Sequence, residues 1–188
     1  MARARALGVS LSHGKSGRSA LTPPRLGLLL ALAVFALDQG SKYWIVHVFD
    51  LGARAPIPLL PVLDLVLAWN KGVSYSLFRA DEALGRAALI GVALAAIVGL
   101  GVWLFRAPNR LTGVALGLLI GGAAGNAVDR LQYGAVADFL YFHTPVSLGP
   151  LSNYVFNVAD MGIVGGVALL LYESLTPGRS AAREAGGA

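Results

Sequence analysis

The chain has 188 residues, of which 56% are hydrophobic and 13% are charged, and it contains no cysteine. Soluble domains carry about 25% charged residues, so this composition excludes an ordinary soluble domain and favours an integral membrane protein. The lack of cysteine excludes a thiol nucleophile, disulfides and thiolate metal sites, and the three scattered histidines give no support to a metal site of another kind. The net charge of +5 needs no nucleic-acid partner, because basic residues beside apolar segments fit anionic membrane lipids.

Four apolar segments are long enough to cross a bilayer, which requires about 20 residues each. They are residues 26–48, 84–105, 111–131 and 156–175. We therefore predict an all-α membrane protein with a four-transmembrane-helix bundle. Its single domain spans residues 25–176, between flexible cytoplasmic tails at residues 1–24 and 177–188.

Basic residues set the predicted orientation, because they favour the cytoplasmic ends of spans. The stretch 132–156 has no Lys or Arg, which predicts that it lies outside, together with the loop 47–83. A cleavable signal peptide is the alternative for the first span, but no A-x-A-like site follows it. The basic residues lie before the first span, between the second and third, and after the fourth: Arg3, Arg5, Lys15, Arg18, Arg25, Arg106, Arg110, Arg179 and Arg183.

The loop 47–83 is predicted to contain a small extracytoplasmic β-hairpin or cradle. Pro56, Pro58 and Pro61 oppose a helix there. Two short apolar runs, 63–69 and 73–78, flank a turn that contains glycine, as in a hairpin. Such a hairpin either frames a substrate cleft or only covers the helix ends.

Glycines recur every four residues along the third predicted span, at Gly113, Gly117, Gly121 and Gly125. This spacing makes a groove on one helix face and predicts close packing of a neighbouring helix.

Polar residues inside the spans gather at one level of the predicted bundle. Asp38 and Lys42 share one face of the first helix, four residues apart. We predict mainly structural ion pairs between Asp38 and Lys42 and between Asp129 and Arg130. Three predicted spans bring polar side chains to the outer side of the membrane: Asp38, Lys42, Asn126, Asp129, Arg130, Asn157 and Asp160.

Asp138 and Asp160 are acids without an obvious counter-ion. Two such carboxyls close together tend to share a proton. An ionised carboxylate can activate water while a protonated one donates to a carbonyl oxygen, which is the chemistry of aspartic peptide hydrolysis. Asp160, near a helix start, is favoured as the anion, although such a pair titrates as a unit and its shared proton is not assigned to one residue.

Five segments in order resemble the bacterial lipoprotein signal peptidases (signal peptidase II), a family of aspartic membrane peptidases. The similarity covers residues 26–175, and Tyr75 stands where that family commonly has Phe. The segments are Asp38-Gln39-Gly40-Ser41-Lys42, Asn70-Lys71-Gly72-Val73-Ser74-Tyr75, residues 121–130, Val136-Ala137-Asp138-Phe139 and Phe156-Asn157-Val158-Ala159-Asp160.

The resemblance implies a multi-pass enzyme of the bacterial cytoplasmic (inner) membrane with its active site on the extracytoplasmic side. It would cleave prolipoproteins on the N-terminal side of their diacylglyceryl-modified cysteine, without a metal or cofactor, and the cyclic peptide globomycin would inhibit it. Asp138 and Asp160 would be catalytic, and Asp38 and Lys42 structural. The residues implied to bind substrate or support the site are Asn70, Gly72, Asn126, Asp129, Arg130 and Asn157.

Two other classes of function compete with this interpretation. A proton-coupled transporter subunit could use the same acids as a relay, but the four spans show no inverted repeat and no acid lies deep on the cytoplasmic side. A purely structural membrane protein is the other alternative. The Tyr-Asp and Gly-x-Gly-Asp settings typical of other intramembrane aspartic proteases are absent.

Overall fold

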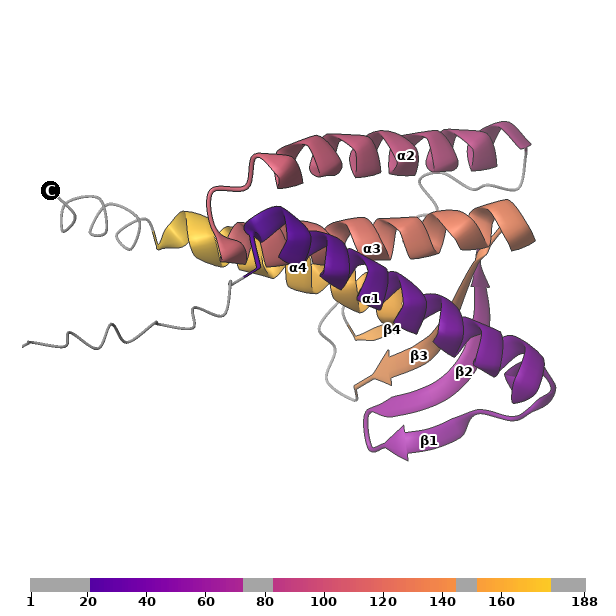
Figure 1. Ribbon diagram of the computed structural model, residues 1–188. Coiled ribbons are helices and arrows are strands. Elements are labelled where there is room, and N and C mark those ends of the chain that lie inside the picture. The colour runs from indigo at the N-terminus through magenta and orange to yellow at the C-terminus, as the bar shows by residue number, and fades with distance from the viewer. Residues whose placement is uncertain (1–20, 73–82, 145–151, 177–188) are drawn as a thin grey trace, which may run out of the picture.

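The computed structural model describes residues 21–72, 83–144 and 152–176. Within these ranges it contains four long helices and a four-stranded antiparallel sheet that packs at one end of the bundle (Figure 1). The helices are α1 (Pro23–Tyr43), α2 (Ala83–Phe105), α3 (Arg110–Tyr133) and α4 (Val158–Leu175), and a short π-helix, Trp44–Val48, extends α1. All four are long and apolar enough to cross a membrane. The four predicted spans are therefore confirmed.

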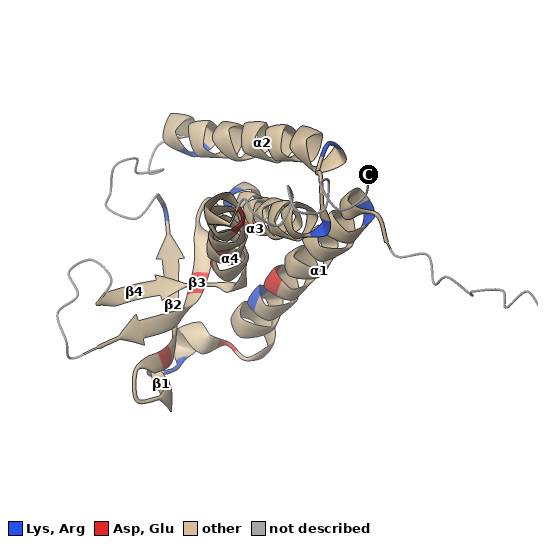
Figure 2. Ribbon diagram, turned by 90° about the vertical axis from the view of Figure 1, so that its left-hand side faces the viewer, with Lys and Arg blue, Asp and Glu red and all other residues tan. Residues whose placement is uncertain are grey.

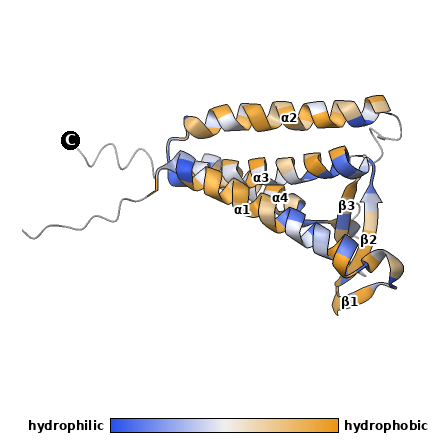
Figure 3. Cartoon of the chain, turned by 45° about the vertical axis from the view of Figure 1, so that its right-hand side comes forward, coloured by the Kyte–Doolittle hydropathy of each residue, from blue (hydrophilic) through white to orange (hydrophobic). Residues whose placement is uncertain are grey.

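Helix α2 presents most of its apolar surface to the outside of the bundle. Leu84, Val98 and Phe105 are each more than 60% exposed, and the helix is apolar along most of its length (Figure 3). Its only charged residue is Arg86, near its start (Figure 2). A helix of this kind is suited to contact with lipid.

The sheet has the strand order β1-β2-β3-β4, with strands β1 (Ile57–Leu60), β2 (Leu63–Asn70), β3 (Val136–His143) and β4 (Asn153–Phe156). The predicted strand at 63–69 is confirmed as β2. The predicted partner run, 73–78, lies outside the described residues. Strand β2 instead pairs with β1 across a tight turn, and with β3 on its other side. Pro58 lies in β1, at the edge of the sheet, where a missing N–H breaks no central ladder.

A neighbouring helix packs closely into the glycine groove of α3, as predicted, and the structure shows that this helix is α1. A Cβ atom on Gly113, Gly117 or Gly121 would collide with backbone carbonyl oxygens of α1. On another face of α3, Gly122 lies against the Ala159 carbonyl of α4 in the same way. Helix α3 is thus the centre of the bundle, and backbone contact between helices brings their polar side chains together.

Gly117→Ala is expected to lower the thermal unfolding temperature of the purified protein. The added methyl would meet the Gly27 carbonyl group, and overpacking of this kind costs about 1–3 kcal/mol. Gly99→Ala in α2 is the matched control, because nothing lies within 4 Å of its added methyl. Equal unfolding temperatures for the two variants would contradict the close approach of α1 and α3.

Candidate active site

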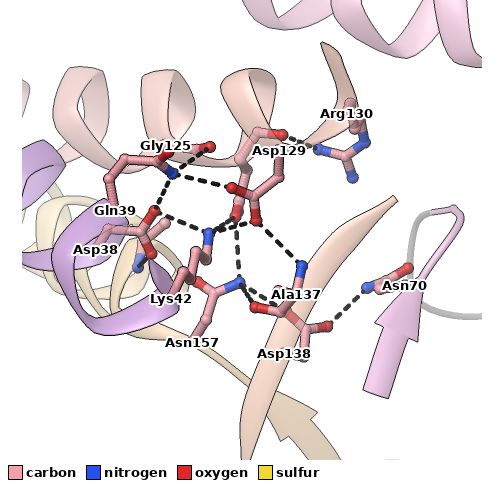
Figure 4. A network of polar contacts seen from close by, with 12 residues as sticks. Asp38, Gln39, Lys42, Asn70, Gly125, Asp129, Arg130, Ala137, Asp138 and Asn157 are labelled. Carbon is pink, nitrogen blue, oxygen red and sulfur yellow. Dashed lines mark hydrogen bonds and ion pairs between the residues drawn. The ribbon is translucent and has the colours of Figure 1, made fainter. Parts of the chain in front are cut away.

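Asp138 lies on β3, where the sheet meets the helix bundle, and its side chain is held by two amides. The residue is 3% exposed, and its carboxyl group accepts hydrogen bonds from Asn157 Nδ2 at 2.6 Å and Asn70 Nδ2 at 3.1 Å (Figure 4). The Gly72 N–H in turn donates to Asn70 Oδ1 at 3.1 Å. This contact leaves the Asn70 NH₂ group facing Asp138, so Gly72 orients Asn70.

Asp160 occupies the first turn of α4, in a capping box with Asn157. The Asp160 N–H donates to Asn157 Oδ1 at 3.0 Å, and the Asn157 N–H donates to Asp160 Oδ2 at 3.2 Å. The sequence Asn157-Val158-Ala159-Asp160 favours this local structure, because an N-cap amide and an N3 acid satisfy free backbone N–H groups reciprocally. Asn126 Nδ2 adds a hydrogen bond to Asp160 Oδ1 at 2.8 Å.

Asn157 joins the two acids. Its oxygen caps α4 beside Asp160 while its nitrogen donates to Asp138, and the residue is fully buried. Burial, and after it the nearby Asp160 carboxylate, raise the pKa of Asp138 to about 7, whereas hydrogen bonds from Asn70 and Asn157 oppose the rise. Near neutral pH, Asp138 therefore holds a proton for much of the time.

Both acids line a cavity of about 470 Å³ between the helices and the sheet. One part of its wall is polar, formed by Asn70, Asn126, Arg130, Asp138 and Asp160. The other part is apolar and comes mainly from α2 and α4, with Leu89, Val92, Ala93, Ala96, Ile163 and Val164. The cavity therefore places two carboxyl groups beside a surface that suits an apolar ligand.

The predicted ion pair between Asp129 and Arg130 is wrong. Neighbouring residues on a helix point about 100° apart, and Asp129 instead pairs with Lys42 at 2.9 Å. Arg130 faces the cavity, where its Nη1 donates to the Asn126 carbonyl at 3.2 Å and its buried Nε has no hydrogen-bond partner. The Arg130 guanidinium group therefore forms part of the cavity wall.

The predicted ion pair between Asp38 and Lys42 is confirmed, at 2.8 Å. Neither residue lines the cavity; both are buried behind it. Gln39 was not singled out from the sequence, yet its amide donates to Asp38, Asp129 and the Gly125 carbonyl. The sequence feature that could have identified Gln39 is its position in a polar run within an otherwise apolar span.

In the part of the chain that the structure describes, no three His, Cys, Asp or Glu side chains are grouped to hold a metal ion.

Comparison with known proteins relates the chain to one described family. Residues 30–176 match the family model described as Signal peptidase (SPase) II. The lipoprotein signal peptidase of Beijerinckia indica is 52% identical over 156 residues, which are 83% of this chain and 91% of the relative. That of Methylorubrum extorquens strain PA1 is 52% identical over 157 residues, 84% of this chain and 90% of the relative.

A solved structure described as a bacterial membrane enzyme matches with a TM-score of 0.66 and 25% identity, over 79% of this chain and 87% of that one. With its four apolar helices, the chain is a multi-pass membrane peptidase. It belongs to the signal peptidase II family. The alternative of a proton-coupled transporter subunit finds no support among these relatives.

Proposed function

We propose that this protein is an aspartic endopeptidase that removes signal peptides from prolipoproteins, cutting on the N-terminal side of the diacylglyceryl-modified cysteine. The observation that carries the proposal is the pair of Asp138 and Asp160, joined through Asn157 at the polar end of a largely apolar cavity. The relatives named lipoprotein signal peptidase support the substrate class.

In the proposed reaction, the Asp160 carboxylate takes a proton from a water molecule whose oxygen attacks the scissile carbonyl carbon. Protonated Asp138 donates its proton to the carbonyl oxygen, which gives a neutral tetrahedral gem-diol. The gem-diol returns its hydroxyl proton to Asp138 as the carbonyl re-forms, and Asp160 passes its proton to the departing amine nitrogen as the C–N bond breaks. Both acids then regain their starting states. Arg130 lines the cavity, where its guanidinium group is suited to hold a peptide carbonyl of the substrate.

We also propose that the protein lies in the bacterial cytoplasmic membrane. Arg25, Arg106 and Arg110 lie at or beside the helix ends remote from the sheet, so that end would be cytoplasmic. The sheet would form an extracytoplasmic cradle over the active site. One peptidase domain of residues 25–176 would then lie between two cytoplasmic tails, residues 1–24 and 177–188, and membrane lipids would contact the outer face of α2.

Cleavage of a diacylglyceryl-modified prolipoprotein by the purified protein in detergent tests the function. We expect a shift to the mature form on a gel, and globomycin should prevent it. A transporter would need a sealed compartment and would leave the substrate intact. An intact substrate under conditions where the protein remains folded would overturn the proposal.

The value of kcat/KM for cleavage is expected to fall as pH rises through about 7. The reaction needs a protonated Asp138, and the raised pKa of this carboxyl places loss of its proton near pH 7. Initial rates between about pH 5 and 9 at low substrate concentration report this free-enzyme titration. A rate that instead increased across the alkaline half of that range would show that Asp138 is not the acid.

A further inference from the structure

The two buried acids behind the cavity, Asp38 and Asp129, each hold the backbone next to one of the proposed catalytic aspartates. Asp38 Oδ1 accepts the Ala159 N–H at 2.9 Å, directly before Asp160. Asp129 Oδ2 accepts the Ala137 N–H at 3.1 Å, directly before Asp138. Both helix-borne carboxylates thereby position chain segments that carry the reacting groups.

Lys42 connects these two anchors. Its Nζ lies 2.8 Å from Asp38 Oδ2 and 2.9 Å from Asp129 Oδ2, and the side chain is only 4% exposed (Figure 4). Gln39 Nε2 donates to the same two carboxylates, at 3.1 and 2.9 Å. A buried ion cluster of this kind is not in itself a strong source of stability. Stability alone therefore does not explain why these residues also contact the active site.

The third contact of Lys42 reaches the site itself. Its Nζ donates to Asn126 Oδ1 at 3.2 Å, and Asn157 Nδ2 donates to the same oxygen at 3.2 Å. With its oxygen held by two donors, Asn126 turns its NH₂ group to Asp160 at 2.8 Å. If the Asn126 amide were turned over, its NH₂ group would face the ammonium group of Lys42, and Asp160 would lose this hydrogen-bond donor.

We propose that Lys42, held between Asp38 and Asp129, is a positioning residue that orients the Asn126 amide toward Asp160 and sets the two proposed catalytic aspartates at their working separation. This inference rests on the proposed peptidase function. It assigns to the buried charge cluster of Asp38, Lys42 and Asp129 an effect on turnover, beyond the structural role expected from the sequence. Misplacing reacting groups by about 1 Å can cost on the order of 100-fold in rate.

The test compares Lys42→Met with the charge-balanced double variant Lys42→Met/Asp38→Asn. Lys42→Met alone leaves two buried carboxylates without a cation and threatens folding. The double variant leaves the net charge of the cluster unchanged, since one positive and one negative charge are removed together. The amide oxygen introduced by Asp38→Asn can still accept from the Ala159 N–H, so the double variant chiefly loses the contacts of Lys42 with Asn126 and Asp129.

Glu173→Gln is the matched control for a general loss of stability. Glu173 lies at the other end of the bundle, where its carboxylate accepts from Asn109 and from Thr112 Oγ1 at 2.9 Å. The substitution should lower the unfolding temperature and leave kcat unchanged.

Steady-state cleavage of the lipid-modified substrate is measured for each variant, with thermal unfolding alongside. We expect the double variant to lose at least about tenfold in kcat with KM changed less than about threefold, because a misaligned site still binds substrate. Asn126→Leu should show a similar loss, and adding it to the double variant should lower kcat by clearly less than the product of the two separate losses, since both changes remove the Lys42–Asn126 contact. A wild-type kcat in the folded double variant, or fully additive losses, would overturn the inference. Failure of the wild-type protein to cleave would instead overturn the proposed function.

Discussion

Asp138→Asn and Asp160→Asn are each expected to reduce cleavage by on the order of 10²–10⁴-fold, the usual cost of removing an acid or base from a reaction. An amide cannot take a proton from water or supply one to the scissile carbonyl oxygen. The fold should persist, because among the described residues neither acid is in a salt bridge and Asn keeps the shape of Asp. Rates with lipid-modified substrate and thermal unfolding temperatures together check both halves of this expectation.

Asp64→Asn is the matched control for this experiment. Asp64 lies on β2 of the same sheet and contacts His143 at 3.3 Å, away from the cavity. Its substitution removes one carboxylate from the sheet without touching the site, so cleavage should continue at the wild-type rate. If an Asp138 or Asp160 variant kept more than about a tenth of wild-type activity, that residue would not be catalytic.

A substrate without its diacylglyceryl group is expected to be cleaved far more slowly than the matched lipid-modified form. The apolar wall from α2 and α4 lies beside the two aspartates. Each methylene buried there contributes roughly 0.8 kcal/mol, so acyl chains can hold the scissile bond in place. Without them, the peptide backbone must enter an apolar region with little compensation.

The loss should appear in kcat as well as in KM, because binding energy from the lipid is used to position the reacting bond. Rates over a range of concentrations on the paired substrates measure both quantities, with an identical peptide sequence as the internal control. Equal cleavage of the two would mean that the cavity recognises peptide sequence alone, and the role assigned to its apolar wall would be wrong.

Features that depend on local sequence were predictable from the chain alone. The four spans follow from apolar length, because a helix that crosses lipid must satisfy its backbone internally over about 20 residues. Close packing of a neighbouring helix on α3 follows from glycines four residues apart, although the identity of that helix, α1, does not. The Asp38–Lys42 pair follows from i,i+4 spacing on one helix. Asp138 and Asp160 were predicted as a pair from their lack of counter-ions and from the family pattern; their catalytic role stays a prediction.

Only the tertiary structure decided which neighbours these residues meet across elements. Asp129 pairs with Lys42 of α1 rather than with the adjacent Arg130, because the rotation of α3 against α1 sets the direction of each side chain. Asn70 reaches Asp138 because the register of β2 with β3 places Asn70 opposite Val136. Strands as short as β1 and β4 depend on partners distant in sequence for their pairing and register. Local pattern therefore predicted β2 but not the four-stranded sheet that carries Asp138. The apolar wall of the cavity likewise exists only because α2 and α4 both line the same space beside the site.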